Sequence, residues 1–220
     1  MKRIVFCDFD RTITVRETFV DILRRFAGES YDKVAPSFRS GKVTLRQGVR
    51  MLVESIPSDR YPEMLAHIRR QDIRPGFPEF LDFLAERAVP FVVISGGLIG
   101  LVSARLESLS DRIHAIHAAD VRDDGDYLQV ESPFEGGTEL VAKVDVMSRY
   151  VFDEAVAIGD GLTDRNIAMT ASVVFARDGL QAWLRESGKA FFAWEDFFDI
   201  RERLARMWDL EKEAGSGNKL

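Results

Sequence analysis

Aspartates and glycines gather at three points of the chain, each directly after an apolar run. Asp8-Phe9-Asp10-Arg11-Thr12 follows Ile4–Phe6, and Ser95-Gly96-Gly97 follows Pro90–Ile94. Gly159-Asp160-Gly161-Leu162-Thr163-Asp164 follows Ala155–Ile158. If these runs are neighbouring parallel strands, their carboxyl ends meet at the crevice where open α/β sheets bind ligands. Four carboxylates, a hydroxyl and several backbone N–H groups would then share one pocket.

Such a pocket favours a hard cation and a phosphate ester. Crowded carboxylates repel one another unless they are paired or bind a cation, and oxygen ligands without His or Cys favour Mg²⁺. One aspartate could attack phosphorus and form an aspartyl-phosphate, and another two residues on could protonate the leaving oxygen and later activate water. Mg²⁺, Ser95, Lys143 and the N–H groups near Gly96 and Gly97 could neutralise the phosphoryl charge.

In this order, the motifs resemble those of the haloacid dehalogenase superfamily of phosphohydrolases. The resemblance implies that Asp8 is the nucleophile and that Asp10 is the general acid and base. It further implies that Asp160 binds Mg²⁺ together with Asp8 and Asp10, the latter through its backbone carbonyl, and that Asp164 supports the site. The residues expected to hold the phosphoryl group are Thr12, Ser95, Gly96, Gly97 and Lys143.

The stretch after the first motif resembles the helical cap of the phosphoserine-phosphatase-like branch. Within that branch, four stretches resemble the members that hydrolyse a methylthio-substituted enol phosphate in methionine salvage. Glu17 lies where phosphoserine phosphatases carry a substrate-contacting Glu, so phosphoserine remains an alternative substrate. The four stretches are Arg74-Pro75-Gly76-Phe77, Pro90–Gly97, Phe175-Ala176-Arg177-Asp178 and Asp196–Arg201.

Other readings of the same residues remain open. The protein could transfer the phosphoryl group to a second alcohol, or it could be a non-catalytic binding protein on this fold. A haloacid dehalogenase proper needs neither Mg²⁺ nor a second aspartate, so Asp10 and Asp164 argue against that chemistry. Lys143 could be an ordinary surface lysine, and Asp164 could simply cap a helix.

Four residues are candidates for substrate contact. Arg11 stands where the family commonly has Gly or Ser, which places a bulky cation near the mouth of the site. Glu17 could equally complement the dipole of the helix that it begins. Arg46 and Arg50 share one helical face, which is either solvated or turned toward the substrate.

Strands that alternate with helices predict a Rossmann-like parallel sheet, the core of the haloacid dehalogenase fold. Between Glu17 and about Arg74, helical spacing without a convincing strand predicts a small all-helical cap. We therefore expect an α/β core of residues 1–15 and 76–220 and a cap of residues 16–75. Within the core, helices are expected at Phe80–Glu86, Leu98–Leu109, Glu139–Tyr150, Leu162–Met169 and Trp194–Leu210, a hairpin turn at Asp123–Asp126, strands at Ile113–His117 and Ser172–Phe175, and a frayed tail at Glu211–Leu220.

Composition narrows the class of protein. The 220 residues carry 30 Lys and Arg against 36 Asp and Glu, and this net charge of −6 argues against a dominant nucleic-acid-binding face. The longest uncharged stretch, Ala88–Ala104, is broken by turn residues and too short for a membrane span. The single cysteine, Cys7, excludes an internal disulfide and fits a reducing compartment. We expect a cytoplasmic enzyme acting on a small phosphate ester, without nucleic-acid or membrane partners; its oligomeric state stays open.

Overall fold

The computed structural model describes residues 1–216, with their side chains except those of residues 38, 39 and 211–216. Its centre is a seven-stranded sheet in the order β4-β3-β2-β1-β5-β6-β7. All neighbouring strands are parallel except β3 and β4, so the expected parallel core and its hairpin are both confirmed. The strands are β1 (Arg3–Cys7), β2 (Phe91–Leu98), β3 (Ala115–Arg122), β4 (Gln129–Glu131), β5 (Glu154–Gly159), β6 (Val173–Ala176) and β7 (Phe192–Ala193).

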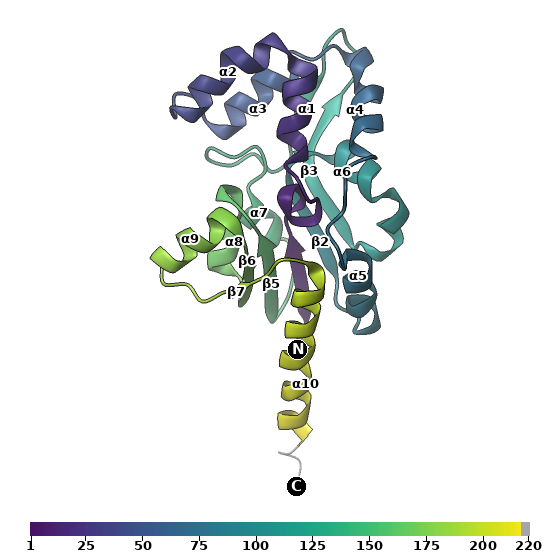
Figure 1. The fold of residues 1–220 in the computed structure, drawn as a ribbon, viewed down its shortest axis with the longest axis vertical. Helices are drawn as coiled ribbons and strands as arrows, with labels where there is room; N and C mark the ends of the chain where they lie inside the picture. Colours follow the sequence, from purple (N-terminus) through teal and green to yellow (C-terminus); the bar gives the residue numbers. More distant parts are fainter. Residues whose placement is uncertain (217–220) are drawn as a thin grey trace.

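Helices flank this sheet and extend beyond one end of it. Figure 1 shows α5 and α6 to one side, α7, α8 and α9 to the other, and α1 to α4 gathered at the top. None of the helices over residues 1–216 is long and apolar enough to cross a membrane. Their bounds are α1 (Thr18–Ala27), α2 (Glu29–Arg39), α3 (Leu45–Val53), α4 (Tyr61–Ile68), α5 (Phe77–Glu86), α6 (Ile99–Leu106), α7 (Lys143–Met147), α8 (Arg165–Thr170), α9 (Asp178–Glu186) and α10 (Phe197–Ser216).

The middle strand, β1, lies in the buried centre of the sheet. Val5, Phe6 and Cys7 are fully buried because helices cover both faces of a parallel sheet. At one end of the core, Phe77 and Phe80 pack against Phe197 at the start of α10. Phe197 therefore belongs to the core, as do Trp194 and Trp208, whereas Phe198 is exposed.

The α1–α4 group begins directly after the first motif and is joined to the core by two chain segments that pair with each other. Thr14 and Ile73 form an antiparallel bridge, and the N–H of Val15 donates to the carbonyl of Asp72 at 3.0 Å. The buried Arg74 guanidinium donates to the carbonyls of Thr12 at 2.8 Å and Arg11 at 2.5 Å. One arginine thus fixes the backbone of the first motif where the chain returns to the core.

Several element boundaries differ from the sequence prediction. The expected helix Glu139–Tyr150 shortens to α7, because a loop occupies residues 132–142. Ser95-Gly96-Gly97 continues β2 through an irregularity in its register and does not form a separate turn. Helices α2 and α9 were not predicted. The last helix begins at Phe197 instead of Trp194. It continues to Ser216, so the prediction of a frayed tail is wrong for residues 211–216. Residues 217–220 lie outside the described chain.

Candidate active site

The three motifs meet at one end of the sheet, as their spacing predicted. β1 pairs with β2 on one side and with β5 on the other, so the residues that follow these strands become neighbours. Asp8, Asp160 and Asp164 are buried there, and carboxylate oxygens from all three lie within 4.8 Å of one another. Such crowding of like charges requires cationic partners.

Lys143 supplies one of these cations from the start of α7. Its side chain is 1% exposed, and its Nζ donates to Asp8 Oδ1 at 2.5 Å and to Asp164 Oδ1 at 2.7 Å. Burial opposes the charged amine, but these two carboxylates outweigh it and hold the pKa of Lys143 above its ordinary value. Lys143 is therefore a buried ammonium of the site, and the surface-lysine reading is wrong.

Asp164 bonds Lys143 with one carboxylate oxygen and the backbone of the loop after β5 with the other. Its Oδ2 accepts from the N–H groups of Asp160 and Gly161, both at 3.0 Å. A Cβ on Gly159 would lie 2.5 Å from Asp164 Cγ, so the strand can approach this carboxylate only with glycine at that position. The capping and supporting roles considered for Asp164 therefore coexist in one side chain.

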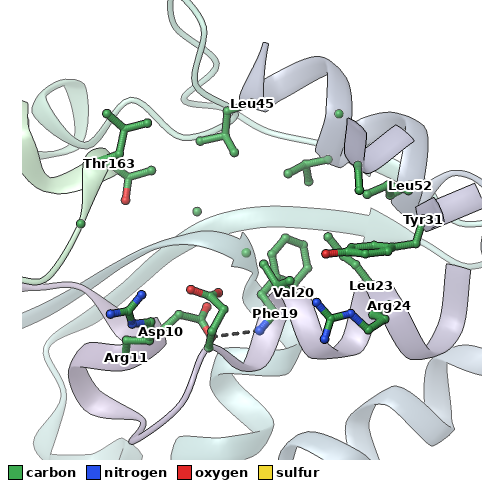
Figure 2. Close-up of a pocket in the computed structure, with 18 of the residues that line it drawn as sticks. Asp10, Arg11, Phe19, Val20, Leu23, Arg24, Tyr31, Leu45, Leu52 and Thr163 are labelled. Atoms are coloured by element: carbon green, nitrogen blue, oxygen red, sulfur yellow. Dashed lines mark hydrogen bonds between the residues drawn. The ribbon is translucent and has the colours of Figure 1, made fainter. Parts of the chain in front are cut away.

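The Asp10 carboxyl faces the N-terminus of α1 and does not belong to the acidic group. Its Oδ1 accepts from the N–H and the hydroxyl of Thr18, at 2.8 and 2.5 Å, and from the N–H of Phe19 at 3.0 Å, as Figure 2 shows for Phe19. Burial raises the pKa of Asp10, although the bonds from Thr18 and Phe19 oppose this. The carboxyl of Asp10 thus links the first motif to the N-terminus of α1.

Ser95 and Thr12 contribute two buried hydroxyls. The Oγ of Ser95 accepts from the N–H of Gly97 at 3.0 Å, which leaves its own O–H free to donate. The hydroxyl of Thr12 has no hydrogen-bond partner among the described residues. Neither lines the open cavity, whereas Gly96 and Gly97 do.

A cavity of about 780 Å³ connects this end of the sheet with the helical group. Its floor includes Asp8, Asp10, Gly96, Gly97 and Asp160. Figure 2 shows Leu45 and Leu52 above the cavity, opposite Asp10 and Arg11. Most of the wall formed by α1, α2 and α3 is apolar, and it comprises Phe19, Val20, Leu23, Val34, Ala35, Leu45, Val49 and Leu52, with Arg24, Tyr31 and Asp32 as its polar members.

The four substrate candidates separate into two pairs. Arg11 and Glu17 line the cavity, whereas Arg46 and Arg50 do not. Arg50 instead donates to Glu54, Glu135 and the carbonyl of Val130, and Arg46 lies 3.9 Å from Glu135. These contacts turn the α3 arginines toward β4 and the loop that follows it, so the structure does not bring them to the site.

The acidic group has the chemistry of a site for a hard divalent cation. It offers only carboxylate oxygens, with no His or Cys among them, which is the donor set that Mg²⁺ favours. Burial and the charge of Asp164 raise the pKa of Asp160 to about 6, as expected for carboxylates that lack sufficient positive charge. The carboxylates are those of Asp8, Asp160 and Asp164; the Asp10 carboxylate is not part of the group.

Two features of the site escaped the sequence prediction. Arg24 and Tyr31 line the cavity from α1 and α2, with the guanidinium carbon 5.4 Å from the ring centroid. Helical spacing could have placed Arg24 beside Val20 on one face of α1. Asp178 pairs with Arg11 at 2.9 Å, a contact across 167 positions that no local pattern reveals.

Comparison with known proteins agrees with this geometry. A family model described as haloacid dehalogenase-like hydrolase matches residues 5–169. A protein of Microcystis aeruginosa named 2-hydroxy-3-keto-5-methylthiopentenyl-1-phosphate phosphatase is 46% identical over 206 residues, covering 93% of this chain and 98% of that protein. The bifunctional enzyme MtnB/MtnX of Bacillus licheniformis is 32% identical over 213 residues, which cover 92% of this chain and 49% of that enzyme.

The fold also has counterparts among solved structures. A substrate-bound complex of phosphoserine phosphatase aligns with a TM-score of 0.68 at 22% identity and covers 92% of this chain and 98% of that one. The likeness extends over both the sheet and the helical group, and at this identity it concerns the fold alone.

Proposed function

The chain belongs to the family of haloacid dehalogenase-like hydrolases, and we propose that it hydrolyses 2-hydroxy-3-keto-5-methylthiopentenyl-1-phosphate, a step of methionine salvage. The observation that carries this proposal is the cavity. It joins the Asp8 carboxylate to an apolar wall on α1 and α3, and so suits a phosphate ester with an uncharged tail. The name and 46% identity of the Microcystis aeruginosa relative support the same substrate.

The proposed reaction uses Asp8 and Asp10 in two steps. An oxygen of Asp8 attacks phosphorus, the bond from phosphorus to the enol oxygen breaks, and Asp10 donates its proton to that oxygen. Asp10 then takes a proton from water, which attacks the aspartyl-phosphate and releases inorganic phosphate. The raised pKa of Asp10 favours the protonated form that the first step needs.

The remaining site residues have electrostatic roles in this proposal. Lys143 fixes Oδ1 of Asp8 at 2.5 Å, which leaves Oδ2 as the attacking atom. The phosphoryl oxygens would accept hydrogen bonds from the hydroxyls of Ser95 and Thr12 and from the N–H groups of Gly96 and Gly97. Mg²⁺, held by Asp8 and Asp160, would neutralise phosphoryl charge. Because the Asp10 carboxylate faces α1, only its backbone carbonyl can be a ligand, as the family resemblance implies.

We also propose that residues 16–75 act as a cap over a core of residues 1–15 and 76–220. Asp10 supports this division, because its carboxyl binds the first N–H groups of α1 while its backbone belongs to the catalytic motif. Movement of α1 would therefore reorient the general acid.

We also propose that the protein is cytoplasmic and has no nucleic-acid or membrane partners. The net charge of −6 and a single buried cysteine support this proposal.

The substrate proposal is tested by kcat/KM for the methylthio enol phosphate, phosphoserine and p-nitrophenyl phosphate, each with Mg²⁺ and with EDTA. We expect the enol phosphate to be the best substrate and EDTA to abolish turnover. Leu45→Asn on the apolar wall should lower kcat/KM for the enol phosphate by about tenfold, while p-nitrophenyl phosphate changes little. Leu65→Asn on α4, outside the cavity lining, is the matched control. Equal losses on both substrates, or equal effects of the two variants, would contradict a tail-binding wall.

Phosphoserine is the second candidate, favoured by the charged groups at the cavity wall. Glu17 and Arg24 could pair with the ammonium and carboxylate of an amino acid. A higher kcat/KM for phosphoserine than for the enol phosphate would establish this alternative. Transfer of the phosphoryl group to added alcohol, measured as a new ester, would extend it to a phosphotransferase.

A further inference from the structure

Arg11, which lines the cavity, forms an ion pair with Asp178, and both residues have unusual backbone conformations. Their φ angles are 58° and 46°, in the left-handed region that non-glycine residues seldom adopt. Only one other non-glycine residue of the described chain, Ala88, has a positive φ. Two strained residues that contact each other beside a catalytic motif indicate a functional constraint.

The guanidinium of Arg11 bridges the acidic group and the outer carboxylate. Its Nε lies 3.2 Å from Asp160 Oδ2, and its Nη2 lies 2.9 Å from Asp178 Oδ2. The side chain of Asp160 is only 11% exposed, whereas that of Asp178 is 36% exposed. Arg11 therefore has one partner inside the site and one at its rim.

The backbone of Arg11 is fixed while its side chain is accessible. Its N–H donates to Thr14 Oγ1 at 3.1 Å, and its carbonyl accepts from Arg74. The side chain itself is 45% exposed. The guanidinium can thus change partners without movement of the motif.

The charges of the site give a reason for the Arg11 guanidinium to change partners when a metal ion binds. Asp8, Asp160 and Asp164 face the ammonium of Lys143 and the guanidinium of Arg11, which leaves a single net negative charge. A divalent cation added to the group would reverse that sign, and it would meet Arg11 at the same carboxylate. The two cations therefore compete for Asp160.

We propose that Arg11 is a built-in counter-ion of Asp160 that competes with Mg²⁺, and that Asp178 draws the guanidinium to the rim when the metal binds. The inference rests on the proposed metal dependence of the phosphatase. It assigns to Arg11 and Asp178 the tuning of metal affinity, a positioning role separate from the chemical step.

The test is the Kd of Mg²⁺, measured by isothermal titration calorimetry on metal-free protein. Arg11→Gln should tighten Mg²⁺ binding by roughly tenfold, because the competing cation is gone. Asp178→Asn should weaken it by several-fold, because Arg11 then has Asp160 as its remaining carboxylate partner. The two variants break the same ion pair, so a merely structural role of that pair would move both Kd values in one direction.

Arg177→Gln is the matched control for long-range charge. The Arg177 side chain also bonds Asp178, at 3.1 Å, but it forms no ion pair with Asp160. The Kd of Mg²⁺ for the Arg177→Gln variant should stay within about twofold of the wild-type value. Arg11→Gly, which suits the positive φ, replaces Arg11→Gln if that variant does not fold.

An unchanged or weaker affinity in the Arg11 variants would overturn the proposal, as would equal tightening in Arg177→Gln. If the wild-type protein binds no Mg²⁺ yet hydrolyses phosphate esters, the competition fails while the phosphatase assignment survives. Mg²⁺ binding that follows the expected pattern in a protein without phosphatase activity would support the competition and refute the proposed function.

Discussion

At the scale of single residues, burial makes the charges of the site interdependent. Lys143 is 1% exposed and bonds both Asp8 and Asp164, so loss of Lys143 would leave two buried carboxylates without this cation, and loss of either aspartate would leave Lys143 with one carboxylate partner of the two. Glu17 stands outside this trio, on the cavity wall. The limited hydration of its carboxylate, and the nearby charges of Asp10 and Asp160, raise the pKa of Glu17 to about 7.

Glu17→Gln should stabilise the metal-free protein at alkaline pH. Because the pKa of Glu17 is raised in the folded state, its protonated form favours folding below its ordinary value of 4.5, and this contribution is lost as pH rises through about 7. The variant should therefore have a Tm roughly 1–3 °C above wild type well above pH 7 and an equal Tm at pH 4.5. The measurement is thermal unfolding in EDTA at both pH values.

The matched control is Glu79→Gln, which removes an exposed carboxylate from the first turn of α5. It should not raise the Tm at either pH. A Glu17→Gln protein that is no more stable than wild type at alkaline pH would show that the carboxylate is not under electrostatic strain.

Sequence could predict which residues of the motifs gather at the site, because each follows an apolar run that becomes a strand. It could not predict how their side chains face. Asp10 turns to Thr18 because the α1 N-terminus offers unpaired N–H groups, and this depends on the path of the chain between them. The pairing of Arg11 with Asp178 depends on the order of the strands in the sheet.

At the scale of elements, α3 covers the open edge of the sheet. Arg50 Nη1 donates to the carbonyl of Val130 at 2.7 Å, and Glu54 Oε1 accepts the Val130 N–H at 3.2 Å. Together these side chains satisfy the outward backbone groups of the edge strand β4, as a neighbouring strand would. Arg50, which was a candidate for substrate contact, thus joins the helical group to the sheet.

Arg50→Met should loosen this junction. Amide hydrogen exchange in residues 129–135 should become faster, and the Tm should fall by about 2–4 °C, because the Val130 carbonyl and Glu135 lose a charged donor. Arg46→Met is the control, since the Arg46 side chain pairs with Glu135 at the longer distance of 3.9 Å and its backbone bond to Thr138 survives the substitution. Equal exchange in wild type and Arg50→Met, or equal acceleration in both variants, would contradict the account of the junction.

The elements that sequence could predict are those with strong local patterns. Ile4–Phe6 and Ala155–Ile158 are continuous apolar runs, and Thr44 caps α3 by accepting the N–H of Gln47 at 3.2 Å. Helix α2 contains Pro36 in its interior, where proline is disfavoured, so its sequence does not favour a continuous helix. Helix α7 is short because residues 132–142 form a loop that contacts α3, where the Arg46 N–H donates to the Thr138 carbonyl at 2.9 Å, and that constraint is tertiary.

At the scale of the whole molecule, strand order creates the active site. The central position of β1 between β2 and β5 brings the three motifs together, and the helical group closes a cavity above them. The acidic excess of the chain is in part a local feature of this site, where a divalent cation would offset it. We propose that this arrangement makes Asp8 a nucleophile for phosphate esters.

The most direct test is rapid acid quench of the enzyme during turnover of the methylthio enol phosphate with Mg²⁺, followed by peptide mass spectrometry. We expect one added phosphoryl group on the peptide that contains Asp8, located at Asp8 by fragmentation. Asp8→Asn should carry none and release no phosphate. Turnover by wild type through a phosphoryl group on another residue, or near-normal turnover by folded Asp8→Asn, would contradict it.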